Sequence, residues 1–247
     1  MIDPAFLRRA DDLQRRSGEQ HCITHTGFLT PAEQHALETR PHLRSSLFFH
    51  GGGPDAERRV AFFLPDYLAP EDFDPEDHIT AFRLICRFGA PGHRDVLGSL
   101  LGLGIERWTV GDIYTSGESA WFFCLPSVAE HLQRELTHIG RNGVQVGVLP
   151  LAEVPAPGRE REELSFTVSS LRLDAVLAGT FNLSRGVAAE QIESGLVSLN
   201  YSICEKPATE LDVDDVFSLR GSGKAILAEI SGKSRKDRTR IRVEKYR

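Results

Sequence analysis

Hydrophobic and polar positions in the C-terminal third of the chain follow first a helical and then a strand period. Apolar residues recur at helical spacing after Leu171 and again after Leu183, which predicts two short helices. Ser184 is a favourable cap, so the second helix is predicted to begin at Arg185. Residues 239–246 alternate with period two and predict a strand with Ile241 and Val243 on its buried face.

The middle of the chain alternates strand and helix patterns. Strands are predicted at 79–88, 109–114, 120–125 and 144–151, with helices at 92–103 and 127–139. The order βαββαβ is that of the ferredoxin-like unit, a fold shared with RNA-recognition (RRM) modules. Trp121 and Phe123 alternate with Phe122, so this strand offers either core aromatics or an exposed base-stacking surface.

The first part of the chain predicts a smaller mixed unit. A helix is expected at 4–16, a second helix capped by Thr30, and two strands at 47–49 and 60–64 joined by a glycine-rich loop. Glu57 and Arg58 beside that loop are expected to form an internal ion pair. The proline-punctuated stretches 69–77 and 154–164 are taken as linkers. The prediction is therefore an α+β protein with a small mixed domain (1–75), a ferredoxin-like or RRM-like domain (76–155) and an RNA-binding domain (165–247).

Charge is distributed unevenly along the chain. The net charge is −6, from 29 basic and 35 acidic residues. Residues 1–164 contain 16 arginines and no lysine against 24 acidic residues, whereas residues 231–247 contain 8 basic and 2 acidic residues. Such an asymmetry indicates a nucleic-acid-facing C-terminal end on an acidic body. A solvated charged strand or a basic tail is the alternative interpretation.

Two arginines stand at predicted helix starts, where the helix dipole disfavours a positive charge. Arg172 precedes the first C-terminal helix and Arg185 begins the second. A bound phosphate would reverse that preference, because free backbone N–H groups and guanidinium groups both favour an anion. The alternative is a surface ion pair of Arg172 with Asp174 or Glu190.

The candidate RNA-binding residues follow from these patterns. They are the two helix-start arginines and the cap Ser184, the turn residue Asn200, the pair flanking a Gly-Ser-Gly turn, and the basic residues of the C-terminal segment: Arg172, Ser184, Arg185, Asn200, Arg220, Lys224, Lys233, Arg235, Lys236, Arg238, Arg240 and Arg242. Asn200 is expected mainly to order its own turn. His93 and Arg94 are secondary candidates for RNA contact, with helix capping and anchoring as the alternative.

The motifs of common enzymes are incomplete here. His93-Arg94-Asp95 copies a kinase triplet, but no lysine precedes residue 165, so the strand lysine of a kinase is missing. Gly51-Gly52-Gly53 lacks the Gly-Lys-Ser/Thr of a P-loop, and no glycine-rich cofactor loop follows a strand. The four cysteines are far apart, which predicts reduced thiols rather than a zinc site or disulfides. No cofactor and no metal are therefore expected. No apolar run approaches the ~20 residues that a membrane-spanning helix needs, and the N-terminus does not resemble a signal peptide, so no membrane association is expected either.

Several blocks resemble one known family. Residues 172–174 (RLD), 183–185 (LSR), 192–200 (IESGLVSLN) and 214–224 (DDVFSLRGSGK) resemble the RNA-binding domain first seen in ribosomal protein S-four, the alpha-L motif. Together with residues 93–98 (HRDVLG) and 232–238 (GKSRKDR), they resemble the YlmH-type RNA-binding proteins over nearly the full length.

The resemblance implies a cytoplasmic, non-enzymatic factor. It implies binding to ribosomal RNA and tRNA on the large ribosomal subunit, in ribosome-associated quality control of subunits obstructed by peptidyl-tRNA. Two other functions are weighed against it: a protein-binding adaptor whose acidic front half contacts a basic partner, with a minor RNA anchor, and an RNA-modifying enzyme.

Overall fold

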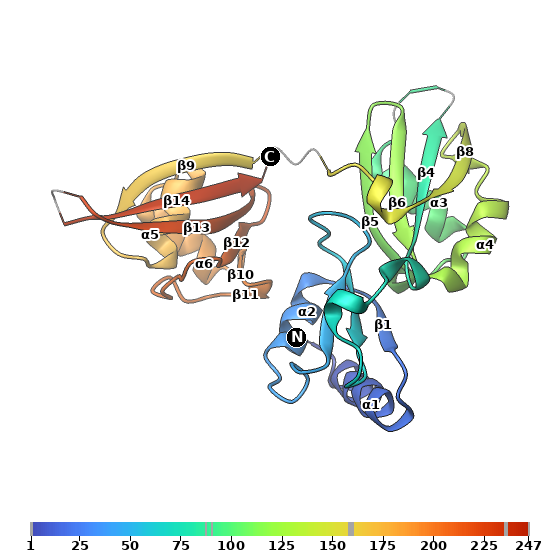
Figure 1. The fold of residues 1–247 in the computed structure, drawn as a ribbon. Coiled ribbons are helices and arrows are strands. Elements are labelled where there is room, and N and C mark those ends of the chain that lie inside the picture. Colours follow the sequence, from blue (N-terminus) through green and yellow to red (C-terminus); the bar gives the residue numbers. More distant parts are fainter. Residues whose placement is uncertain (1, 87, 90, 158–160, 235–236, 247) are drawn as a thin grey trace. The chain divides into compact units, whose positions relative to one another are not determined.

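A computed structural model of the chain describes residues 2–86, 88–89, 91–157, 161–234 and 237–246 (Figure 1). The chain divides into two compact units, residues 2–158 and residues 159–247. The mixed α and β content confirms the predicted α+β class. Within the described ranges, no helix has both the length and the apolar character that a bilayer crossing needs.

The first unit begins with two helices on a three-stranded antiparallel sheet. The elements are α1 (Pro4–Gln20), β1 (Thr24–Leu29), α2 (Pro31–Glu38), β2 (Leu47–His50) and β3 (Arg59–Phe63), and the strand order is β1-β3-β2. The predicted helix start at Thr30 is confirmed as a full capping box, in which Thr30 and Glu33 bond each other's backbone N–H groups. Helix α1 is longer than predicted, because its last polar turn carries no apolar periodicity.

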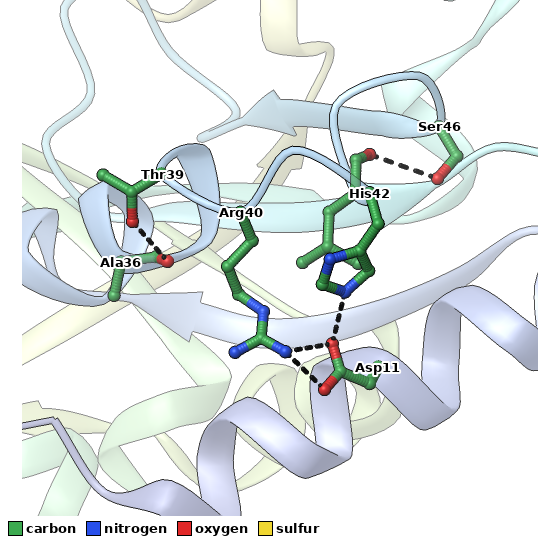
Figure 2. A network of polar contacts seen from close by, with 7 residues as sticks. Asp11, Ala36, Thr39, Arg40, His42 and Ser46 are labelled. Carbon is green, nitrogen blue, oxygen red and sulfur yellow. Dashed lines mark hydrogen bonds and ion pairs between the residues drawn. The ribbon is translucent and has the colours of Figure 1, made fainter.

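Asp11 ties α1 to the loop that follows α2. Its carboxylate accepts two bonds from Nη2 of Arg40, at 2.9 and 2.7 Å, and contacts Nε2 of His42 at 2.9 Å (Figure 2). This loop leads into β2, so the Asp11 contacts fix how α1 lies on the sheet. Beneath them, apolar residues of α1, α2 and β3 form a small core, including Ala10, Leu37 and Phe63.

A five-stranded sheet forms the rest of this unit. Its elements are β4 (Thr80–Cys86), α3 (His93–Gly102), the 3-10 turn η3 (Arg107–Thr109), β5 (Val110–Ser116), β6 (Ser119–Cys124), α4 (Pro126–Glu135), β7 (His138–Ile139) and β8 (Asn142–Leu149). The order β5-β6-β4-β8-β7 is antiparallel throughout. Without β7, this is the predicted ferredoxin-like arrangement, with the first and third strands in the middle.

The predicted helix 127–139 is too long. Helix α4 ends at Glu135, and His138–Ile139 instead pair with Asn142–Gly143 around a turn in which Gly140 has φ +58°. Leu136 and Ile139 are both buried, so their spacing imitates a helical face although they belong to different elements.

Both faces of the central strands are covered by hydrophobic residues over much of their length. Phe82 and Phe122 pack under α3 and α4. Phe123, on the opposite face, packs against Phe28 and Phe62 of the three-stranded sheet. The alternative of base stacking on Phe123 is therefore wrong, because Phe123 is fully buried. Trp121 is half-buried, and the Arg83 guanidinium lies 5.9 Å from the centre of its ring.

The acidic stretch 69–77 is ordered rather than a free connection. It forms two 3-10 turns, η1 (Pro70–Asp72) and η2 (Pro75–Asp77), between which Phe73 is buried and contacts Phe62 and His78. Phe73 is thus a buried apolar residue within a stretch whose prolines and acidic residues suggested a linker. The predicted domain boundary at residue 75 stays a prediction.

The second unit carries two helices on one face of a six-stranded antiparallel sheet (Figure 1). Its elements are β9 (Arg161–Val168), α5 (Leu173–Phe181), α6 (Arg185–Glu193), β10 (Val197–Leu199), β11 (Ser202–Ile203), β12 (Val216–Leu219), β13 (Gly223–Lys233) and β14 (Thr239–Tyr246). The core between helices and sheet includes Val176, Leu177, Ile192, Phe217 and Val243. Strand β9 begins at Arg161, inside the stretch predicted as a linker, because residues 161–164 pair with the end of β14.

Candidate nucleic-acid interface

The two predicted helices of the second unit begin as expected. Arg172 is the N-cap residue of α5, with extended backbone angles and no capping bond from its side chain. Ser184 caps α6, its hydroxyl accepting a 3.2 Å bond from the N–H of Val187, and Arg185 is the first helical residue. Both predicted helix-start arginines therefore stand where the dipole disfavours a cation.

Asp174 brings these two arginines together. Arg172 donates from Nε and Nη2 to the two carboxylate oxygens of Asp174, at 3.2 and 2.8 Å. Arg185 donates from Nη2 to Oδ1 of the same carboxylate, at 3.1 Å. The Asp174 side chain is 5% exposed, while those of Arg172 and Arg185 are 37% and 48% exposed. One carboxylate thus orients two guanidinium groups, and one positive charge remains in excess.

The carboxylate is held in its charged form. Burial alone would raise the pKa of Asp174, but the hydrogen bonds and the positive charges of Arg172 and Arg185 together outweigh burial and leave this pKa below its ordinary value. The bond to Asp174 in turn raises the pKa of Arg172. The alternative predicted for Arg172, an ion pair with Asp174, is therefore formed, and it still leaves the outer edges of both guanidinium groups at the surface.

A hollow of about 490 Å³ connects the start of α6 with the start of β14. Arg185 and Arg238 both line it, together with Gly179 and Thr167. Arg238 is fixed by bonds to the hydroxyl (3.1 Å) and carbonyl oxygen (2.7 Å) of Thr167. Gly179 allows the ring of Phe166 to lie directly against α5, because a Cβ at this position would be 2.2 Å from that ring. Arg185 and Arg238, 53 positions apart in sequence, thus lie in one concave surface.

Two candidate arginines, Arg240 and Arg242, stand at alternate positions of β14 and differ in their surroundings. Arg242 contacts the carboxylates of Glu244 (3.0 Å), Glu229 (3.3 Å) and Glu163 (3.7 Å). The bond to Glu229 is the largest of the effects that raise the pKa of Arg242. Arg240 is exposed and has no ion pair with any residue that the structure describes. Strand β14 therefore leaves the charge of Arg240 unpaired among the described residues, whereas carboxylates neutralise that of Arg242.

The remaining candidates of this unit lie near the ends of β13 and in the turns beside it. Lys233 pairs with Asp237 at 2.6 Å, and Arg235 and Lys236 fall outside the described residues. Lys224 lies 4.3 Å from the centre of the Tyr246 ring, and Arg220 is exposed in the turn between β12 and β13.

Asn200 orders its own turn, as the sequence favoured. Its amide nitrogen donates to Asp215 at 2.7 Å, and its amide oxygen accepts from the N–H of Val216 at 3.0 Å. The side chain thus joins the turn after β10 to the start of β12.

His93 and Arg94 belong to the first unit. They are the first two residues of α3, both exposed, and Asp95 completes the first turn. The sequence had singled out His93 and Arg94 as candidates. It did not show that Asp174 bonds both Arg172 and Arg185, because the contact between Asp174 and Arg185 spans 11 positions and follows no local spacing.

Known proteins share both parts of this architecture. Residues 70–153 match the family described as the putative RNA-binding domain in YlmH, and residues 171–217 match the S4 domain. With its helix pair and sheet, the chain is thus a multidomain α+β protein of the S4-containing RNA-binding class.

A relative identifies the family within this class. The chain is 33% identical over 244 residues to the ribosome-associated protein quality control protein P2 of Bacillus subtilis (strain 168), covering 98% of this chain and 95% of that protein. The chain belongs to the YlmH family. A solved structure, the cell division protein ylmH from Streptococcus pneumoniae, matches with a TM-score of 0.52 at 21% identity, over 63% of this chain and 98% of that one, and supports the fold.

Proposed function

We propose that this protein binds ribosomal RNA, with an adjacent tRNA, on the large ribosomal subunit, and acts there in quality control of subunits obstructed by peptidyl-tRNA. Its mechanism is binding and positioning in the cytoplasm, without bond chemistry. The name of the Bacillus subtilis relative supports the ribosomal setting, and the two matched RNA-binding families support RNA as the ligand.

One observation carries the proposal: Asp174 aligns Arg172 and Arg185 while neutralising only one of them. Guanidinium groups fixed in this way can grip phosphate oxygens at little further cost in side-chain entropy. Arg238 extends the same surface across the hollow, and Arg240 adds a further exposed charge. Ser184, Arg220, Lys224 and Lys233 are proposed as flanking contacts, and His93 and Arg94 as secondary ones.

The first test replaces Arg185 by Gln and measures binding to ribosomal RNA fragments over a range of salt concentrations. Losing one phosphate contact should lower the affinity and reduce the slope of log binding constant against log salt by about 0.9. Arg15, an exposed arginine paired with Asp12 on α1, provides the matched control as Arg15→Gln. An unchanged salt slope in Arg185→Gln would remove this residue from the interface.

The second test concerns the ribosomal particle. The full chain is sedimented with purified large subunits carrying peptidyl-tRNA, with vacant large subunits and with small subunits. Retention should be greatest with the obstructed large subunit. Equal retention by small subunits would contradict the proposed setting while leaving RNA binding intact.

A third measurement separates the adaptor hypothesis, which the acidic residues 1–164 favour. Partners that copurify with the protein should be lost after ribonuclease treatment if RNA holds them. Partners retained after complete digestion would support a protein-binding adaptor instead.

A further inference from the structure

A cleft of about 390 Å³ lies in the first unit, far in sequence from the S4 domain. It is lined by residues of α1 and β1, including Phe6, Arg9 and Gly27, and by Arg58 and residues 106–108. Its volume lies within the range of about 300–1,000 Å³ that is usual for small-molecule sites. None of the residues lining it was singled out for binding by the sequence.

Two half-buried arginines stand side by side in this cleft. Arg58 donates to the carbonyl oxygens of Phe28 (2.7 Å) and Val110 (3.3 Å), and Arg107 also donates to that of Val110. Neither guanidinium has an ion pair with a described residue, and the predicted pair between Arg58 and Glu57 is not formed. Carbonyl oxygens thus fix the two groups in place, and their charges are not neutralised by direct contact with a carboxylate.

Two carboxylates near these arginines, those of Glu33 and Asp112, accept hydrogen bonds from other groups. Glu33 accepts from the N–H and hydroxyl of Thr30, both at 2.7 Å, as part of the capping box. Asp112 accepts from the backbone N–H groups of Glu57 (2.6 Å) and Arg58 (3.3 Å). Glu106 lines the cleft but is exposed.

Burial lowers the pKa of both arginines. Burial, and to a smaller extent the charge of Arg58, lower the pKa of Arg107 to about 10, against the opposing effect of Asp112. For Arg58, burial outweighs the charges of Glu33 and Asp112, which raise its pKa without a direct ion pair. A bound anion would relieve both effects, since an opposite charge favours the protonated form.

An aromatic ring borders the same cleft. Trp108 is 49% exposed, although one side of its indole lies against β1. A Cβ at Gly27 would lie 2.5 Å from Cε3 of Trp108, so this close approach requires a glycine. The indole is therefore held in place by the backbone while part of it remains open to solvent. A planar ring fixed in this way suits the stacking of a nucleobase.

We propose that this cleft binds a nucleotide, with its phosphate between Arg58 and Arg107 and its base against Trp108. Two adjacent guanidinium groups suit a phosphate, which can carry two charges, better than a single carboxylate. The nucleotide comes either from a free nucleoside monophosphate or from an RNA strand, since both present the same chemistry. The site goes beyond the function proposed above and uses none of its residues.

Fluorescence of Trp108 tests the proposal. The chain has two tryptophans, so Trp121→Phe leaves Trp108 as the single reporter. AMP should quench it saturably, and adenosine, which lacks the phosphate, should bind at least about tenfold more weakly, a difference of ~1.4 kcal/mol. A tetraadenylate that binds at least about tenfold more tightly than AMP would identify an RNA strand as the source, and equal or weaker binding would identify the free nucleotide.

Arg107→Gln in the same background should weaken AMP binding at least about tenfold. Arg141→Gln, in the exposed turn between β7 and β8, should leave it unchanged. Because Arg107 also bonds two carbonyl oxygens, the AMP and adenosine comparison on one protein provides a test that does not depend on this variant folding.

Two results would overturn the nucleotide site: no saturable quenching by AMP or tetraadenylate up to about 10 mM, or equal affinities for AMP and adenosine. Binding of ribosomal RNA by the same protein, measured in parallel, reports on the S4 domain separately. Failure of the cleft and failure of the ribosomal function are therefore distinguishable.

Discussion

The guanidinium of Arg185 lies 3.1 Å from the carboxylate of Asp174, although the two residues are 11 positions apart and belong to different helices. This contact joins the start of α6 to the first turn of α5. It also places the second arginine of the candidate interface beside the first, because Arg172 bonds the same carboxylate. The positions of Arg172 and Arg185 thus depend on Asp174, a negatively charged residue that would not itself contact a phosphate.

Replacing Asp174 by Asn should destabilise the second unit by about 1–3 kcal/mol, because the amide lacks the negative charge and one of the two buried oxygens that accept from Arg172 and Arg185. Urea titration followed by hydrogen exchange in β12 and β13 measures this loss within the second unit. Asp212→Asn, at an exposed position, should stay within about 0.5 kcal/mol of the wild type. Equal stability of the two variants would show that Asp174 does not support the fold.

The contribution of Asp174 should disappear in acid. Since its folded-state pKa lies below the ordinary value of about 3.9, the carboxylate contributes stability that is present above this pH and lost as the pH falls towards the folded pKa. The stability difference between the wild type and Asp174→Asn should therefore be constant from about pH 5 to pH 8 and shrink below about pH 4. A difference that persisted unchanged at low pH would mean that the ion pairs are not its source.

Arg240 and Arg242 form a matched pair on one face of β14. Arg240→Gln should lower the affinity for ribosomal RNA and reduce the salt slope by about 0.9. Arg242→Gln should change the salt slope much less, because three carboxylates already neutralise this arginine. Equal effects of the two variants in the same salt titration would show that Glu163, Glu229 and Glu244 release Arg242 to the RNA.

Gly179 and Gly186 test the packing of the helix pair. Gly179→Ala should cost about 1–3 kcal/mol, because its Cβ would overlap the Phe166 ring. Gly186→Ala, in α6, meets no atom within 4 Å and should stabilise the unit by about 0.5–1 kcal/mol. Urea unfolding of the second unit compares both variants, and a neutral Gly179→Ala would mean that Phe166 moves aside freely.

Much of the fold was predictable because local spacing determines it. The two helices after residue 171, the cap Ser184 and the period of β14 follow from spacings within single elements, and the βαββαβ order follows from the succession of such elements. Local patterns gave a wrong prediction at Leu136 and Ile139, which have the spacing of one helix but belong to different elements. They also gave no sign that Phe73, within a polar and acidic stretch, would be buried.

The site was less predictable because its partners are distant in sequence. Spacing indicated which arginines stand at helix starts, but it did not show that Asp174 serves both, or that Arg242 is surrounded by acids from three strands. The cleft at Trp108 assembles residues separated by a hundred positions, and no local motif marks it.

Strand β9 forms one edge of the six-stranded sheet and pairs with β14 along its whole length. A fragment that starts at residue 165 would keep only half of β9, and the distal half of β14 would remain paired with β13 but lose its pairing with β9. Unpaired strand edges recruit other strands, so such a fragment should self-associate through the very strand that carries Arg240 and Arg242. Excision of this unit for isolated study should therefore start no later than residue 161.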